Sequence, residues 1–215
     1  MGCLYKGGIL KKILVVLIGI PCALFPAAAC AELNYDAISL GYGKISESGW
    51  PDMTAYLFGI TKSLSKDVYV GADYERDTQP TVFGDATGSS IALTVGFHTP
   101  LKENTDLLFT GSLMNGSADL AGFSSTSTGY QLTAGIRAEL APQIEGGLGL
   151  GYANTNTSFL GASSSTTSTG LNMSIGFKVT PVLQLVAELG SATHTPQNSA
   201  SYSTRLIGFG AKIYY

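Results

Sequence analysis

His194 and the serines around it are the residues of this sequence best placed, by type and spacing, to carry out nucleophilic chemistry. Ser191, Ser199 and Ser201 lie within a few residues of this histidine. A serine becomes a nucleophile when a histidine accepts its proton, and a third group usually orients that histidine. Because no carboxylate lies close to His194 in the sequence, we predict an exposed loop histidine and a protein that is not an enzyme.

The other ionisable residues flank short polar links between apolar segments. His98 and Asp106 are predicted to meet across one link, in a structural hydrogen bond or, alternatively, a proton-linked switch. Arg137 and Glu145 are predicted to form an ion pair across another link. The full set expected to gather in one interior, as a salt-bridged plug, is His98, Asp106, Arg137, Glu139, Glu145, Lys178, Glu188 and Lys212.

Metal and nucleotide sites are not indicated. The two histidines are far apart in the sequence, and acidic residues are sparse in the polar segments, so neither a zinc site nor a calcium loop is expected. The glycines follow a strand alternation and do not open a helix, which argues against a phosphate-binding loop. We therefore predict no cofactor.

The elements that position these residues are predicted to be strands, because apolar and polar residues alternate with a period of two from residue 35 onward. The pattern recurs in segments of about ten residues separated by turns, which is typical of a transmembrane barrel. We expect an all-β, antiparallel, up-and-down β-barrel of ten strands, at 35–46, 53–64, 68–77, 89–99, 105–115, 128–140, 144–154, 168–179, 183–193 and 202–215.

Short and long links alternate along the chain, so the strands are predicted to pair as hairpins with both termini at one end. The short links should face the periplasm and the long ones the outside. The long loops are expected at 47–52, 78–88, 116–127, 155–167 and 194–201. Eight strands remain possible if the hairpin around residues 144–179 is an extended outer loop.

Alternation also assigns the two faces of each strand. Val68, Val70, Ala72 and Tyr74 share one face, and Tyr69, Gly71, Asp73 and Glu75 share the other. Tyrosines on the apolar face fall near one end of their strands and phenylalanines near the other, like the aromatic girdles at two membrane interfaces. The apolar face is therefore predicted to contact lipid, and a soluble sandwich with this face buried is the alternative.

The N-terminus has the form of a secretory signal. Lys6, Lys11 and Lys12 precede an apolar run at 13–25 and a stretch of small residues, which predicts a signal peptide at 1–31 and one barrel domain at 32–215. Lipidation of Cys30 is an alternative. All three cysteines lie at or before position 30, so the predicted mature chain has no disulfide.

The charge balance argues against a nucleic-acid partner. Without Lys6, Lys11 and Lys12, 9 basic residues remain against 15 acidic ones, a net charge of −6. Nucleic-acid binding calls for a basic surface instead.

The last strand resembles the C-terminal strand of bacterial outer-membrane barrels. Phe209, Ile213 and the terminal Tyr215 alternate with small or polar residues. The resemblance covers residues 33–215 and implies residence in the bacterial outer membrane, with outer-membrane lipid, lipopolysaccharide and the barrel-assembly machinery as partners. The chain is similar in size to OmpA-like and opacity-protein barrels, but no peptidoglycan-binding domain is expected in it, and the ten strands predicted exceed their usual eight.

Three hypotheses for the role follow. The first is a structural or adhesin-like surface role through the outer loops, whose apolar residues, candidates for contact with an unknown extracellular ligand, include Phe83, Phe123, Phe159 and Leu160. Packing of these loops on each other explains the same residues. The second is a narrow, porin-like channel for small solutes, and the third is a lipid-modifying enzyme that uses His194.

Overall fold

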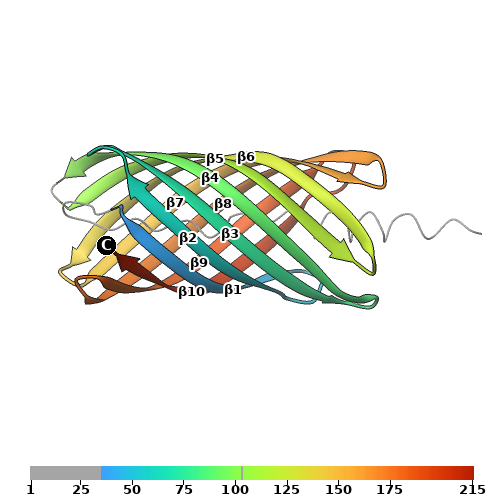
Figure 1. Cartoon of the computed structure of the whole chain (residues 1–215), viewed down its shortest axis with the longest axis horizontal. Helices are drawn as coiled ribbons and strands as arrows, with labels where there is room; N and C mark the ends of the chain where they lie inside the picture. The colour runs from blue at the N-terminus through green and yellow to red at the C-terminus, as the bar shows by residue number, and fades with distance from the viewer. Residues whose placement is uncertain (1–34, 103) are drawn as a thin grey trace, which may run out of the picture.

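Ten antiparallel strands form a closed barrel in the computed structural model, which describes residues 35–102 and 104–215 (Figure 1). The strands are β1 (Ala37–Glu47), β2 (Met53–Ser63), β3 (Val68–Thr81), β4 (Gly84–Lys102), β5 (Thr105–Leu120), β6 (Phe123–Ala141), β7 (Ile144–Phe159), β8 (Ala162–Thr180), β9 (Leu183–Pro196) and β10 (Tyr202–Tyr214). Each strand pairs with its neighbours in sequence, and β1 pairs with β10 to close the barrel.

This topology confirms the predicted ten-stranded up-and-down barrel. It excludes the eight-stranded alternative, because residues 144–179 form β7 and nearly all of β8, and it excludes the two-sheet sandwich. The predicted signal peptide lies outside the described residues. Within the described residues there is no helix long and apolar enough to cross a membrane.

Three of the five long outer loops predicted from the sequence are wrong. Residues 78–88, 116–127 and 155–167 belong mostly to strands, and the connections there shrink to 82–83, 121–122 and 160–161. A tilted strand needs only about 9–11 residues to span a bilayer, whereas β4, β6 and β8 each have 19. The hairpins from β3 to β8 therefore continue well beyond the membrane.

The turns at the tips of these hairpins explain how the strands continue so far. Ala121 and Gly122 have φ angles of 51° and 83°, and Leu160 and Gly161 have 48° and 79°. Two successive positive φ angles are typical of a two-residue type I′ turn, whose twist matches that of paired strands. A leucine at such a position is unusual, because its Cβ crowds the backbone there.

Side chains are distributed inside out relative to a soluble protein. Leu93 and Phe209 on the outer surface are 60% and 63% exposed, whereas Arg137 and Gln184 in the interior are 1% and 0% exposed. Burying a charge while exposing a continuous apolar band is favourable only if lipid surrounds the outside. The prediction that the apolar face contacts lipid accords with this distribution.

The seam between the first and last strands is tied together at one end. Lys62 forms an ion pair with Asp36, just before β1, and this contact together with the Ser63 N–H holds the pKa of the Asp36 carboxyl below its usual range. Tyr215 donates its N–H to the Asp36 carbonyl, and its ring lies 5.3 Å from the Lys62 ammonium. The C-terminal residue therefore fastens β10 to both β1 and β2.

Gly96 shows why the interior needs small residues. It lies directly opposite Tyr69, and a Cβ at this position would overlap the tyrosine ring. The ring cannot easily move, because it is 2% exposed and stacks on Tyr35 at a centroid distance of 4.5 Å. An aromatic ring that covers a glycine in the neighbouring strand helps to fix the register.

We expect Gly96→Ala to destabilise the barrel by about 1–3 kcal/mol, because the added methyl displaces a packed ring. The measurement is the temperature at which the folded band converts to the unfolded band on a gel. Gly111→Ala is the matched control, because the nearest atom to a Cβ there lies at 3.7 Å. Equal transition temperatures for the two variants would contradict this account.

Candidate functional site

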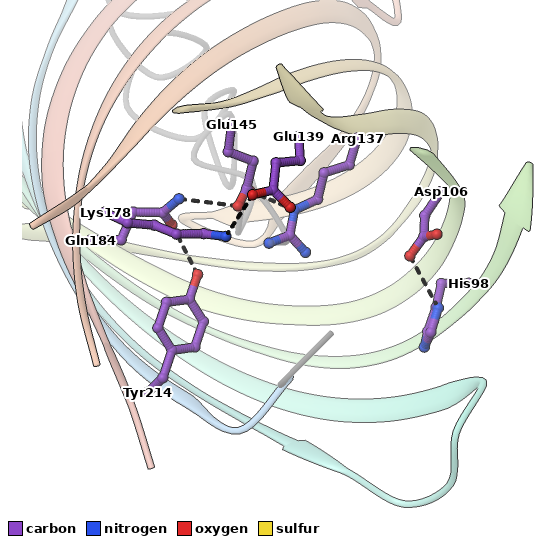
Figure 2. A network of polar contacts seen from close by, with 8 residues as sticks. All are labelled: His98, Asp106, Arg137, Glu139, Glu145, Lys178, Gln184 and Tyr214. Carbon is purple, nitrogen blue, oxygen red and sulfur yellow. Dashed lines mark hydrogen bonds and ion pairs between the residues drawn. The ribbon is translucent and has the colours of Figure 1, made fainter. Parts of the chain in front are cut away.

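The barrel interior is the candidate site, because most of the ionisable side chains of the strands point into it. Period-two alternation sends one residue in two inward from every strand. Eight interior residues make polar contacts near the barrel end where β4, β6 and β8 end, which is the end predicted to face the periplasm. We call them the interior belt: His98, Asp106, Arg137, Glu139, Glu145, Lys178, Gln184 and Tyr214 (Figure 2).

The centre of the interior belt is the ion pair between Arg137 and Glu145, which the sequence predicts. The two come from β6 and β7 and are 1% and 3% exposed. The second carboxylate oxygen of Glu145 accepts a hydrogen bond from Gln184 Nε2 at 3.1 Å, and Gln184 Oε1 accepts one from the Tyr214 hydroxyl at 2.8 Å. These hydrogen bonds on the Glu145 side offset part of the cost of burying the charge pair.

Two further pairs complete the interior belt. Lys178 Nζ lies 3.6 Å from Glu139 Oε1. His98 Nδ1 lies 3.4 Å from Asp106 Oδ2, but among the described residues neither atom makes a hydrogen bond, so the predicted hydrogen bond is not formed. His98 instead lies against the Tyr35 ring, at a centroid distance of 4.3 Å.

The predicted plug is arranged along the wall. Each pair in the belt joins strands that are neighbours or have one strand between them: β4 with β5, β6 with β7 or β8, β7 with β9, and β9 with β10. Figure 2 shows His98 and Asp106 apart from the other six residues, which gather on another part of the wall. The interior belt is therefore a polar lining held within the wall.

Lys212 lies opposite Gln184 of the belt, and Glu188 lies four residues further along β9. The Lys212 ammonium interacts electrostatically with the carboxylates of Glu145, Glu188 and Asp73. A cavity of about 40 Å³ lies beside Lys212, Glu188 and Asp73, against the backbone at Gly41 and Gly210. This space is enough for roughly three water molecules.

An acidic wall that was not among the predicted interior charges runs along β1 and β3 inside the barrel. Glu47 on β1 and Asp73, Glu75 and Asp77 on β3 all point inward, by the alternation of burial along their strands. The faces predicted for β3 already turned Asp73 and Glu75 inward, but Asp77 stood at a predicted strand end. Among the described strand residues, eight carboxylates and three cations face the interior, a net charge of −5 with neutral histidines.

The prediction of an exposed loop histidine at His194 is wrong. His194 lies within β9, points inward and is 2% exposed. Its Nδ1 is 2.8 Å from Ser168 Oγ, its Nε2 is 3.0 Å from Thr204 Oγ1, and its ring stacks on Tyr202. Its serine partner is Ser168, which lies opposite it on the neighbouring strand β8. It is none of the serines close to it in the sequence, which are Ser191, Ser199 and Ser201.

The predicted contact residues lie at the hairpin tips. Phe83 and Leu160 are 58% and 71% exposed in their turns. Phe123 and Phe159, from adjacent hairpins, lie edge to face at a centroid distance of 6.3 Å, which is the packing between loops weighed as an alternative. Phe209, Ile213 and Tyr215 lie on the lipid-facing side of the last strand or just after it.

Metal ligation finds no support in the described part of the chain. No group of three or more histidine, cysteine, aspartate or glutamate side chains among residues 35–102 and 104–215 is placed to hold a metal ion. The charges of the interior belt are arranged as pairs and short hydrogen-bonded chains instead.

Comparison with known proteins bears on the fold. No protein-family model matches the chain, and no curated protein sequence matches it. The outer membrane protease OmpT from Escherichia coli has a TM-score of 0.51 at 11% identity, over 84% of this chain and 96% of that one. The β domain of the Bordetella autotransporter BrkA has a TM-score of 0.52 at 12% identity, over 84% and 100%. An outer membrane channel from Pseudomonas putida F1 has 0.53 at 11% identity, over 91% and 100%.

The fold shared with these proteins, together with the apolar exterior and polar interior, defines a small transmembrane β-barrel of the outer-membrane type. The three similar structures are a protease, an autotransporter domain and a channel. One fold therefore hosts several activities, and the role has to be argued from the interior and the surface.

We expect Arg137→Met to lower the stability of the barrel by about 3–5 kcal/mol, because it leaves the Glu145 carboxylate buried without its cation. Arg137→Met combined with Glu145→Gln should recover much of this loss, since no buried charge is left over. The midpoint of urea unfolding in detergent micelles measures both. A double variant no more stable than Arg137→Met would show that the pair does not interact as described.

Proposed function

We propose that the chain resides in the bacterial outer membrane and forms a narrow, water-filled channel that favours small cations and cationic solutes. The observation that carries this proposal is the charge of the interior wall, where eight carboxylates face three cations. A pore lined with acidic side chains attracts cations and repels anions.

Desolvation explains why the acidic wall favours a hydrated interior. Moving a carboxylate from water into a dry, low-dielectric medium costs several kcal/mol even after relaxation. Arg137 and Lys178 are paired with Glu145 and Glu139, Asp106 lies beside His98, and Lys212 interacts with Asp73 and Glu188. Among the described residues, Glu47 Oε2 and Asp77 Oδ1 are buried without a hydrogen bond. Water or mobile cations are the natural compensation for these two carboxylates, and either requires access to the interior.

The lining itself supports passage of solutes. Along β7, for example, the inward residues above Glu145 are Gly147, Gly149, Gly151 and Ala153, whose side chains take up little or none of the lumen. The Asn172 amide lies over Gly149, and Ala153 packs with Ala92 and Met114. Above these β7 residues, Thr155 and Thr157 add hydroxyls that can replace the hydration of a passing ion. Two small apolar clusters interrupt this polar lining, one of them formed by Ile45, Met53, Ala55 and Leu206.

The position of His194 does not support the hypothesis of a lipid-modifying enzyme. His194 points into the barrel and both of its ring nitrogens contact hydroxyls, so it does not face the lipid whose acyl chains such an enzyme would cleave. We retain no enzymatic role for it.

We expect the folded protein to conduct in planar bilayers and to show a reversal potential of the sign for cation preference in a KCl gradient. Asp73→Asn, Glu75→Gln and Asp77→Asn together should lower the ratio of cation to anion permeability at least severalfold, because they remove three charges from one wall of the lumen. The measurement is the reversal potential before and after substitution.

Asp85→Asn with Asp119→Asn is the matched control, because these exposed carboxylates belong to the outward-facing positions of β4 and β5. The control should leave the selectivity unchanged. Correctly folded protein that gives a closed current trace would overturn the channel proposal.

A surface-interaction role is the second candidate, and the exposed apolar tips of the outer hairpins favour it. Val82 is 91% exposed, and Leu160 is 71% exposed in a strained turn conformation. Apolar side chains held above the membrane by paired strands could contact another cell or a host surface.

For this second candidate, we expect Leu160→Asn with Phe83→Ser to abolish any adhesion of cells that display the protein. Asparagine tolerates positive φ better than leucine, so the hairpin should be preserved or slightly more stable. Counting cells retained on a hydrophobic surface measures the effect. Equal retention with and without the substitutions would exclude these tips as the adhesive surface.

A further inference from the structure

Three basic residues gather on the outside of the barrel near its outer end. Lys44 on β1, Arg76 on β3 and Arg205 on β10 are exposed and face outward. Their strands are consecutive in the barrel, in the order β10, β1, β2, β3. We call these three residues the outer basic patch.

The register places the three residues close together. Arg205 lies opposite Ser46, two residues from Lys44, so Arg205 and Lys44 are diagonal neighbours, typically about 7–8 Å apart. Lys44 and Arg76 lie opposite Thr54 and Tyr56 of the intervening strand β2. Strands are about 4.8 Å apart, so these two cations flank a single strand.

A cluster of tyrosines fixes the depth of the outer basic patch in the membrane. Tyr42 and Tyr74 lie two residues to the membrane side of Lys44 and Arg76, and Tyr56 lies opposite Arg76. The rings of Tyr42 and Tyr56 pack edge to face at a centroid distance of 5.4 Å. Tyrosines on the lipid face mark the level of the headgroups, so the cations lie at or just above this level.

The surrounding charges leave the patch positive. In the part of the chain that the structure describes, none of the three cations forms an ion pair. The nearest carboxylate in the β1–β2 connection, Asp52, accepts a hydrogen bond from Ser46 at 2.7 Å. Elsewhere around the outer end, the outward residues of β6 to β9 are hydroxyls and amides, such as Thr126, Asn156 and Ser165.

We propose that the outer basic patch binds the phosphate groups of lipid A in the outer leaflet. Guanidinium and ammonium groups form strong, charge-assisted hydrogen bonds with phosphate, and arginine does so with two donors at once. A doubly phosphorylated lipid complements three cations with no acidic partner, whereas a zwitterionic headgroup would bring its own positive charge into the patch. This inference concerns the outer surface and is independent of conduction through the interior.

The test is binding of lipid A to the detergent-folded full chain, counted by native mass spectrometry. The wild type should bind doubly phosphorylated lipid A, and the triple variant Lys44→Gln, Arg76→Gln, Arg205→Gln should bind it roughly 100-fold more weakly, since each cation near an anionic surface contributes on the order of a fivefold gain. Retained heat-modifiability on a gel shows that each variant is folded.

Two controls decide between phosphate recognition and general lipid binding. Lys66→Gln with Lys102→Gln removes exposed cations from the opposite end of the barrel and should leave the affinity unchanged. Fully dephosphorylated lipid A keeps the acyl chains and should bind weakly to every variant. Two results would overturn the proposal. One is equal affinity of the triple variant and the Lys66→Gln, Lys102→Gln variant for phosphorylated lipid A; the other is equal affinity of the wild type for phosphorylated and dephosphorylated lipid A.

Discussion

The pairing of β1 with β10 is the interaction on which the rest of the structure depends. Eleven residue pairs, from Ala37 with Tyr214 to Glu47 with Thr204, join the two ends of the sheet. Without them, two strand edges would present unpaired N–H and C=O groups to hydrocarbon, where each costs several kcal/mol. The contacts of Tyr215 with Asp36 and Lys62 lie at the end of this seam, so the last residue of the chain helps to hold the ring of strands shut.

Closure also dictates the composition of the interior. A ring of ten strands encloses a limited cross-section, and every strand directs half of its side chains into it. Large residues are admitted only where a neighbour makes room, as where the Tyr69 ring covers Gly96. Charged residues are admitted where a partner or water satisfies them. In the half predicted to face the periplasm, Arg137 pairs with Glu145 and Lys178 pairs with Glu139, whereas the charged interior residues of β3 are all carboxylates.

The strands inside the membrane could be predicted from the sequence because lipid and lumen impose opposite demands on alternate residues. That contrast disappears once a strand leaves the membrane. Residues 116–127 and 155–167 carry mostly polar side chains on both faces, and their few apolar residues cluster at the turns. The sequence there shows no alternation and predicts loops, although the residues on either side of the turns pair one by one. The only local signals there were the glycines at 122 and 161, each in a two-residue turn.

The error over His194 has the same origin and bears on how the outer mouth is built. A loop position predicts a solvated histidine. On β9, His194 instead contacts the hydroxyls of Ser168 and Thr204, and these contacts link β8, β9 and β10. Cross-strand partners of this kind are set by register, which sequence spacing does not reveal. The outer mouth thus combines neutral, hydroxyl-bonded side chains on one stretch of wall with the carboxylates of β1 and β3 on another. An electric field across the lumen follows from that division. In the proposed channel, such a field would orient an entering cation toward β3 before it reached the paired charges of the interior belt.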